Sequence, residues 1–348
     1  MPKPQPRQKP PQKPRKPGNR PSRKAPPKPA RRPAPKGEKA PFRAGFVAVV
    51  GRPNVGKSTL LNQILGEKIA IVTPRPQTTR TRILGIWNGE NAQVALFDTP
   101  GLHKAKGALN QRMVETALQT LPEVDAVLLL IEAGTGPEGR VEVGESTRWV
   151  IDEVKRSGKP AILGINKMDR APRETLLPVI EAYRALHAWT EIVPFSAMTG
   201  ENVDELLRAI VPHLPESEAP LFPPDVMTDQ AERQLAAEYV REQLMLQTRD
   251  EIPYATAVEI EEFDESDRRE HGGLVRIMAR IWVERDSQKA IVIGKGGSML
   301  KQVGTRAREG LERLLGAKVF LKLDVKVEER WSEREATLRR VLPPGEAR

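Results

Sequence analysis

Short apolar runs alternate with longer amphipathic stretches between residues 42 and 213. The strand-type runs are residues 46–50, 92–97, 125–131, 161–165 and 192–195. The stretches with helical spacing lie after residue 57 and near residues 144–157, 172–188 and 201–213. Regular alternation of strands and helices predicts an α/β domain with a doubly wound, mostly parallel sheet. In such a sheet, ligands bind beyond the carboxyl ends of the strands.

The pattern changes beyond residue 228. Two strand-like runs, 255–263 and 274–283, are followed by a glycine turn, a helix with apolar residues at helical spacing, and an alternating strand at 318–327. With a helix before the first strand, the order is α-β-β-α-α-β and predicts a second, α+β domain over residues 229–330. Residues 214–228 contain four prolines and form the predicted linker, and residues 331–348 a C-terminal helix or tail.

The formal net charge of +10 resides in the first 41 residues. They carry fourteen Lys or Arg against one Glu, together with fourteen of the 32 prolines. A segment with so little apolar surface cannot offset the entropy lost on folding, so residues 1–41 are predicted to be a disordered basic tail. It either grips RNA phosphates nonspecifically or is a solubilising extension, and the sequence leaves both open.

Composition also narrows the setting. There is no Cys, which excludes disulfides and thiolate metal sites and favours a reducing cytoplasm. No run of eighteen apolar residues is present, so no membrane span is expected. The amino terminus has no apolar segment of the secretory type.

A phosphate-binding loop follows the first predicted strand directly. It reads G-x-x-x-x-G-K-S, and its nucleotide-contacting residues are Gly51, Arg52, Pro53, Asn54, Val55, Gly56, Lys57, Ser58 and Thr59. The glycines let backbone N–H groups curl around a β-phosphate at the start of a helix. Lys57 is expected to reach the β- and γ-phosphates, and the Ser58 hydroxyl to bind Mg²⁺.

Three further motifs sit at strand ends, as nucleotide contacts require. The first is Asp98, Thr99, Pro100, Gly101 and Leu102; the second is Asn166, Lys167, Met168 and Asp169; the third is Ser196, Ala197 and Met198. Asp98 can hold the Mg²⁺ water shell, and the Gly101 N–H can contact a γ-phosphate. The Asp169 carboxylate can accept two hydrogen bonds from guanine, which adenine cannot offer. The ligand is therefore predicted to be GTP or GDP.

The first switch and the catalytic step leave alternatives open. Thr79 is the expected switch ligand of Mg²⁺, with Thr78 as the alternative. Leu102 stands where Ras-like enzymes place a water-orienting Gln, so intrinsic hydrolysis is expected to be slow. His103 follows as a weaker candidate base. The G-x-P-N-x-G-K-S form resembles potassium-activated GTPases, which makes Asn54 the expected K⁺ ligand.

The second domain carries G-x-x-G between its last two helices, as a type II KH domain does. In that module the glycine turn brings the backbone against single-stranded nucleotides. The predicted RNA contacts are Ile293, Gly294, Lys295, Gly296, Gly297, Lys301, Arg306 and Arg308. Residues 268–326 carry fourteen basic and six acidic residues, and residues 226–267 three basic and twelve acidic, so the basic half is the expected RNA surface.

Taken together, these motifs resemble the Era family of bacterial ribosome-assembly GTPases over about residues 43–342. The resemblance implies binding to the 3′ region of 16S ribosomal RNA and to the 30S precursor, and peripheral contact with the inner membrane. We also expect a cytoplasmic monomer with no DNA partner.

Two hypotheses remain at this point. In the first, GTP hydrolysis times release from RNA and assists assembly of the 30S subunit. In the second, the chain is a nucleotide-responsive RNA-binding module in which hydrolysis is incidental, an alternative that Leu102 keeps open.

Overall fold

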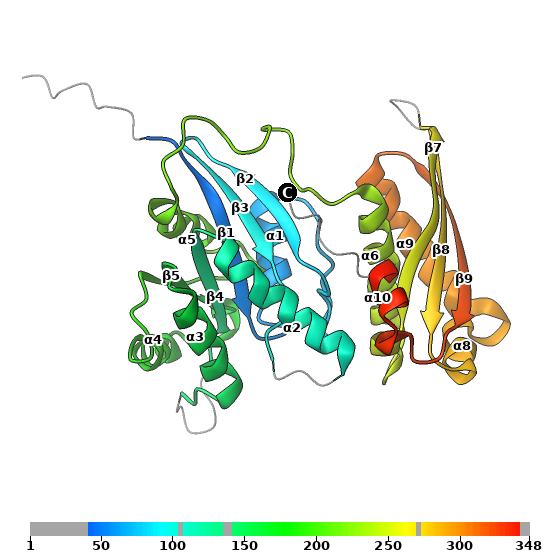
Figure 1. Ribbon diagram of the computed structural model, residues 1–348, viewed down its shortest axis with the longest axis horizontal. Helices are drawn as coiled ribbons and strands as arrows, with labels where there is room; N and C mark the ends of the chain where they lie inside the picture. The colour runs from blue at the N-terminus through cyan, green and yellow to red at the C-terminus, as the bar shows by residue number, and fades with distance from the viewer. Residues whose placement is uncertain (1–40, 104–106, 135–140, 269–272, 342–348) are drawn as a thin grey trace, which may run out of the picture. The chain divides into compact units, whose positions relative to one another are not determined.

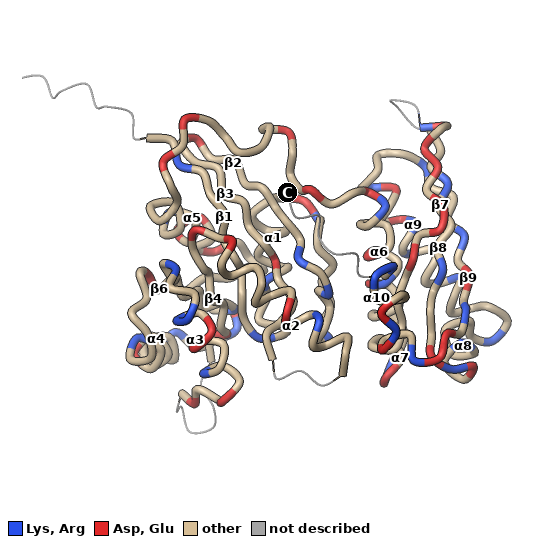
Figure 2. Tube along the Cα trace, viewed as in Figure 1, with Lys and Arg blue, Asp and Glu red and all other residues tan. Residues whose placement is uncertain are grey.

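The computed structural model describes residues 41–103, 107–134, 141–268 and 273–341, which belong to one compact unit. The predicted basic tail falls outside the described residues except for Pro41. Figure 1 labels most of the helices and strands used below, and Figure 2 labels β6 and α7.

The first domain is built on a six-stranded sheet in the order β2-β3-β1-β4-β5-β6. Its strands are β1 (Arg43–Gly51), β2 (Ile83–Asn88), β3 (Ala92–Asp98), β4 (Ala126–Glu132), β5 (Ala161–Asn166) and β6 (Glu191–Pro194). Only β2 runs antiparallel to its neighbour, β3; the remaining pairs are parallel. The predicted doubly wound, mostly parallel sheet is therefore confirmed.

Helices cover both faces of this sheet (Figure 1). They are α1 (Lys57–Leu65), α2 (Ala108–Thr120), α3 (Glu145–Ser157), α4 (Leu176–Arg184) and α5 (Val203–Ile210). The central strands are apolar on both sides, so alternate residues of β1 enter two cores: Val47 and Val49 pack with α1 and α5, and Ala48 and Val50 with α2 and α3. This packing fixes the carboxyl ends of β1, β3 and β5, where the predicted motifs lie.

Two predicted helices are shorter than the sequence suggested. The stretch at 172–188 yields α4 only from Leu176, because Pro172 opens a 3₁₀ turn over Arg173–Thr175 first. The stretch at 201–213 yields α5 and then a 3₁₀ turn over Val211–His213, which contains Pro212. These differences leave the site loops unaffected.

The second domain has the predicted order of elements. It comprises α6 (Glu232–Gln247), β7 (Ala257–Asp267), β8 (Leu274–Val283), α8 (Asp286–Ile293), α9 (Ser298–Leu315) and β9 (Lys318–Val327). In the sheet, β8 lies between antiparallel β7 and parallel β9. The first strand begins two residues later than predicted because a helical turn, α7 (Ile252–Ala255), precedes it.

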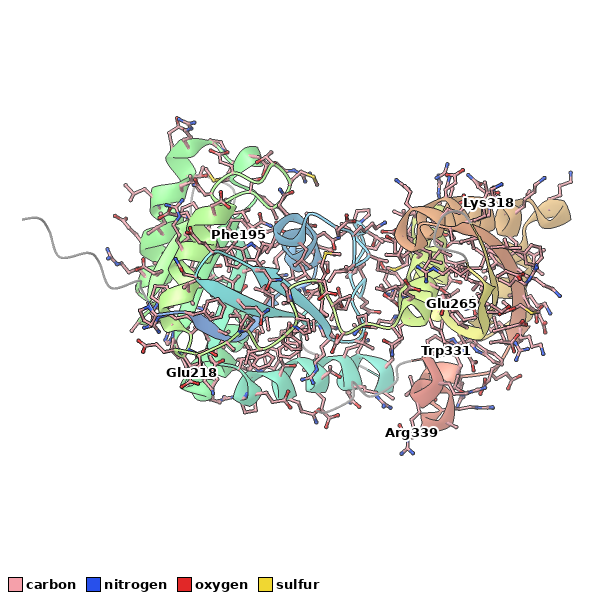
Figure 3. All side chains as sticks on the ribbon, turned by 90° about the horizontal axis from the view of Figure 1, so that it is seen from above. Phe195, Glu218, Glu265, Lys318, Trp331 and Arg339 are labelled. Carbon is pink, nitrogen blue, oxygen red and sulfur yellow. The ribbon has the colours of Figure 1, made fainter. Side chains whose placement is uncertain are left out.

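The C-terminal segment contains a turn at Trp331–Glu333 and the short helix α10 (Glu335–Val341). Trp331, labelled in Figure 3, is fully buried and donates its indole N–H to the Ala255 carbonyl at 2.8 Å. It shares an apolar cluster with Trp282 and Leu338 of the second domain and with Leu109 and Met113 of α2. The two domains therefore meet at this buried cluster.

Candidate functional site

The loop between β1 and α1 is held open by left-handed backbone. Gly51, Asn54 and Gly56 have φ of 152°, 64° and 100°. A Cβ on Gly56 would lie 2.2 Å from Asn166 Nδ2, so that position requires glycine on two counts. The loop's backbone N–H groups can thus turn inward at the amino end of α1, which favours anions.

Lys57 is the first residue of α1, directly after this loop, and it is buried. Its ammonium donates to the carbonyl oxygens of Gly51 at 3.4 Å and Arg52 at 3.2 Å. Burial lowers the pKa of Lys57 to about 8, and the nearby charge of Asp98 opposes that shift. A buried cation with only carbonyl partners is well placed to pair with a phosphate.

Three oxygen ligands converge at the end of β3. Ser58 Oγ lies 2.6 Å from Asp98 Oδ2 and 2.8 Å from Thr79 Oγ1. Asp98 is fully buried, and its second oxygen, Oδ1, has no hydrogen-bond partner among the described residues. Burial raises the pKa of Asp98, while Lys57 and the two hydroxyls lower it. One carboxylate and two hydroxyls, with an unpartnered buried oxygen, fit Mg²⁺ completed by phosphate and water.

The two switch threonines point in different directions. Thr79 Oγ1 faces Asp98 at 3.3 Å. Thr78 Oγ1 instead contacts Thr73 Oγ1 at 2.7 Å and donates to the Arg75 carbonyl at 2.8 Å. The geometry therefore favours Thr79 as the metal ligand and gives Thr78 a role within the switch itself.

The loops after β5 and β6 form the base end of the site. Asn166 donates to the Val55 carbonyl at 2.7 Å and accepts from the Ala197 N–H at 2.9 Å, so one side chain joins the phosphate loop to the third motif. Ser196 Oγ donates to Asp169 Oδ1 at 2.7 Å, which orients the carboxylate.

Two further residues complete the base end. Lys167 donates to the Asn54 carbonyl at 2.8 Å and pairs with Glu132 at 2.5 Å, and Met198 is exposed. The two ends of the site are thus tied together by Asn166 and Lys167, which span the phosphate and base loops.

The position where Ras-like enzymes place a water-orienting side chain is occupied here by a buried leucine. Leu102 is fully buried, and its N–H donates to the Gly51 carbonyl at 3.0 Å. The neighbouring His103 places Nδ1 2.8 Å from the Gly101 carbonyl. Thr99 is buried and donates to the Val49 carbonyl, and Pro100 and Gly101 are buried beside it. A Cβ on Gly101 would lie 2.7 Å from Pro53, so this segment passes close to the phosphate loop.

The glycine turn of the second domain is open to solvent. Gly294, Gly296 and Gly297 have φ of 72°, 60° and 78°. A Cβ on Gly294 would meet Met299, whereas Gly296 and Gly297 have nothing within 4 Å of that position. Ile293 is half-buried before the turn, and the predicted phosphate contacts Lys295, Lys301, Arg306 and Arg308 are all exposed. The turn therefore offers backbone that a nucleic acid strand can approach.

The first switch, residues 77–81, forms hydrogen bonds with the second domain that the sequence did not predict. Arg80 is 4% exposed and donates to the carbonyls of Thr256 at 2.8 Å, Tyr254 at 3.2 Å and Pro253 at 3.4 Å. Its guanidinium also lies 5.8 Å from the Trp331 ring. Burial lowers the pKa of Arg80.

Residues of α6 contact the same switch and the segment that precedes it. Arg241 donates to the Thr78 carbonyl, and Glu242 accepts from the Val72 N–H at 3.0 Å and from Lys68 at 2.5 Å. The partners of these hydrogen bonds lie more than 160 residues apart in the chain, so local sequence patterns do not predict the bonds. The switch that carries Thr79 is thus hydrogen-bonded to the second domain at Thr78 and at Arg80, one on each side of Thr79.

Comparison with known proteins gives the same division. The family described as "50S ribosome-binding GTPase" matches residues 46–167, and the family described as "KH domain" matches residues 251–332. GTPase Era from Geobacter metallireducens is 51% identical over 299 residues, covering 86% of this chain and 97% of that protein. GTPase Era from Lacticaseibacillus paracasei is 46% identical over 296 residues, covering 85% and 95%.

Two solved structures match over both domains. One is Era in complex with MgGDPNP and nucleotides 1506–1542 of 16S ribosomal RNA, with a TM-score of 0.79, 43% identity, and 86% and 98% of the two chains covered. The other is a single-residue variant of Aquifex aeolicus Era bound to GDP·AlF₄⁻, with a TM-score of 0.78, 42% identity, and 86% and 99% covered. Among the described residues, no helix has the length and hydropathy that a membrane crossing needs.

Proposed function

The chain belongs to the Era family of GTPases, and from this premise we propose that it is a GTP-switched protein that binds the 3′ region of 16S ribosomal RNA and assists assembly of the 30S subunit. The description of the broad family that matches the first domain mentions binding to the 50S subunit. The relative solved with RNA over both domains holds nucleotides of 16S ribosomal RNA, and for that reason we assign the small subunit.

The nucleotide roles follow from the site. Lys57 pairs with the β- and γ-phosphates, and Ser58, Thr79 and Asp98 hold Mg²⁺. Asp169, oriented by Ser196, accepts hydrogen bonds from guanine. When bound, Mg²⁺ neutralises charge that builds on the phosphates. The solved relatives hold MgGDPNP and GDP·AlF₄⁻, which supports the same ligand class here.

Hydrolysis is slow in the isolated protein under this proposal. Leu102 is buried and apolar, so it cannot orient the attacking water. We assign K⁺ the role of supplementary charge beside the phosphates. Asn54 supports this, because its Nδ2 donates to the Pro74 carbonyl at 3.0 Å and leaves its side-chain oxygen available to a cation.

One observation carries the switch itself: the segment that supplies Thr79 is bonded directly to the RNA-binding domain through Arg80. Ordering of Thr79 on Mg²⁺ and the γ-phosphate moves the adjacent Arg80, whose guanidinium holds three carbonyls around α7. A nucleotide-dependent shift at Thr79 therefore reaches the second domain without an intermediary.

RNA binding is assigned to the glycine turn and the exposed cations beyond it. The turn approaches the sugar-phosphate backbone, and Lys295, Lys301, Arg306 and Arg308 neutralise phosphates. Monomeric state, cytoplasmic location and peripheral membrane contact stay predictions of the family resemblance. Flotation with vesicles of anionic lipid tests the membrane contact.

The test measures GTP turnover by the full chain in KCl and in NaCl, each with and without RNA of nucleotides 1506–1542. The proposal predicts slow turnover in NaCl and stimulation by KCl, by RNA or by both. Negligible turnover under all four conditions contradicts a hydrolysis-driven cycle and favours the alternative, a nucleotide-responsive RNA-binding module.

The RNA assignment is tested separately by Gly296→Asp. A carboxylate in the turn repels phosphate and leaves the first domain intact, so RNA affinity should fall while GTP affinity stays unchanged. If RNA affinity survives at moderate salt, the glycine turn does not bind RNA.

A further inference from the structure

The second domain's sheet has one covered face and one open face. On β9, Val319, Leu321 and Leu323 belong to the core beneath the helices. The alternate residues Lys318, Phe320 and Lys322 project to the opposite face; Lys318 and Phe320 are exposed, and Lys322 is exposed beside them. Phe320 is 53% exposed, so much of its ring is open to solvent.

The register defines the surroundings of Phe320. On β8, Arg276 pairs with Phe320 and Met278 pairs with Lys322, so these side chains share the open face. At the other end of the sheet the same face is covered, because Trp282 is buried and Arg340 lies 5.1 Å from its ring. Within this open part, we call Arg276, Met278, Lys318, Phe320 and Lys322 the β9 platform; Leu274, opposite Lys318, borders it.

Charge is divided across this sheet. Among the described residues, Lys318 and Lys322 have no ion pair, and Arg276 pairs with Asp267 at 3.0 Å. The acidic residues Glu262 and Asp264 lie on β7, opposite Met278 and Arg276. They stand two strand spacings from β9, about 9.5 Å away. Figure 2 shows basic positions along β9, which also carries Asp324, and acidic positions along β7.

We propose that the β9 platform is a second RNA contact of the domain, in which a base stacks on Phe320 and Lys318 and Lys322 take the phosphates on either side. Each lysine is two residues from Phe320 along the strand, or about 6.6 Å. Lys318 marks the start of β9 in Figure 3. This inference rests on the proposed RNA binding and extends it beyond the glycine turn.

The composition of the platform favours RNA over a protein partner. A stacking aromatic between free cations is the combination that single-stranded nucleic acid binding uses, and it tolerates any base. Protein interfaces bury a larger apolar centre, whereas here the half-buried Met278 and Leu274 are the apolar residues that accompany Phe320 on β8. The acidic β7 edge repels phosphate, so it confines the strand to the β9 side.

The test uses the full chain with Mg²⁺ and GDPNP, and single-stranded fragments of nucleotides 1506–1542 that range from four to about twenty nucleotides. Four nucleotides fill a glycine turn alone. Phe320→Leu retains an apolar side chain and the strand but removes the ring face. We expect it to weaken the long fragments by about 5- to 150-fold and the shortest not at all. Phe320→Trp should bind as well as the parent.

The lysines have a separate readout. Lys318→Ala with Lys322→Ala should reduce the slope of log affinity against log salt by about 1.4 for the long fragments, since each single-strand phosphate contact contributes about 0.7. Lys326→Ala is the matched control, because Lys326 is also exposed on β9 but lies beyond Asp324 and outside the platform. It should leave the slope nearly unchanged.

The outcomes separate the two claims. If Gly296→Asp abolishes binding and Phe320→Leu leaves every fragment unchanged, the platform inference is wrong and the glycine-turn assignment stands. If Gly296→Asp has no effect, the glycine-turn assignment in the proposed function fails, and the result for Phe320→Leu still decides the platform inference. If Phe320→Leu and Phe320→Trp weaken binding equally for all lengths, the residue acts only on the fold, and the platform inference is again wrong.

Discussion

Replacement of Gly56 by alanine should damage the nucleotide site through one defined steric contact. Gly56 has φ of 100°, and an added Cβ would lie 2.2 Å from Asn166 Nδ2. Left-handed backbone costs about 1–3 kcal/mol in a residue with a side chain. Displacing Asn166 also breaks its two buried hydrogen bonds, at about 1 kcal/mol each. Gly56→Ala should therefore destabilise the protein by about 3–5 kcal/mol.

Gly158→Ala is the matched control. Gly158 ends α3 in the same domain with φ of 65°, and nothing lies within 4 Å of its added Cβ. It should cost only the backbone strain, about 1–2 kcal/mol. Urea unfolding without nucleotide measures both variants. A second arm repeats Gly56→Ala in an Asn166→Ala background, where the collision is absent and its cost should fall to strain alone.

Equal losses of stability in the two variants would contradict the proposed contact between Gly56 and Asn166. If Gly56→Ala and Gly158→Ala cost the same, or if the Asn166→Ala background leaves the cost of Gly56→Ala unchanged, then Asn166 does not restrict the loop. The link between the phosphate loop and the base loop would then have to lie elsewhere.

The remaining predictions concern the base, the buried lysine and the switch. Asp169→Asn should lower GTP affinity by more than about tenfold, because an amide cannot accept both guanine hydrogen bonds, while the contacts to Mg²⁺ and the triphosphate survive. Calorimetry measures the affinity, and an unchanged value contradicts the guanine assignment. The pKa of Lys57 is about 8 without nucleotide, and a bound phosphate should raise that pKa. Above pH 8, nucleotide binding should therefore take up a proton, and the affinity for nucleotide should fall as the pH rises. Without nucleotide the unfolded state binds more protons between about pH 8 and 10.5, so this group makes stability rise with pH there. Calorimetry in buffers of different ionisation enthalpy detects the proton, and zero uptake at about pH 9 is the contrary result. Arg80→Ala should leave GTP affinity within about threefold but reduce the difference in RNA affinity between the GDPNP and GDP states, by about fivefold or more; an unchanged difference excludes Arg80 from the coupling.

Local sequence patterns were enough to predict most of the fold. A parallel sheet places the loops after its strands at one edge, and the nucleotide motifs lie in those loops. Apolar runs therefore predict the strands, and the glycine spacing that follows them predicts the site. The order of elements in the second domain was likewise legible and is confirmed. Leu102 was predicted to be unable to orient water; it is fully buried, and its part in hydrolysis stays a prediction.

What the sequence could not predict depends on distant partners. Arg80 looks like an ordinary loop arginine until the fold places the Thr256 and Tyr254 carbonyls around it. The choice between Thr78 and Thr79 depends on which hydroxyl turns toward Asp98, and adjacent residues of one type do not reveal this. The role of Asn166 as a tie between loops, and the exposure of Phe320, likewise emerge only from packing.

The central claim is that the nucleotide state sets the affinity for RNA, and one measurement tests it most directly. Labelled RNA of nucleotides 1506–1542 is titrated with the full chain at fixed salt, once with Mg²⁺ and GDPNP and once with Mg²⁺ and GDP. The account predicts tighter binding with GDPNP, by about 5- to 150-fold, the usual range for coupling between two sites. Equal affinity in the two states, or no binding in either, would contradict it.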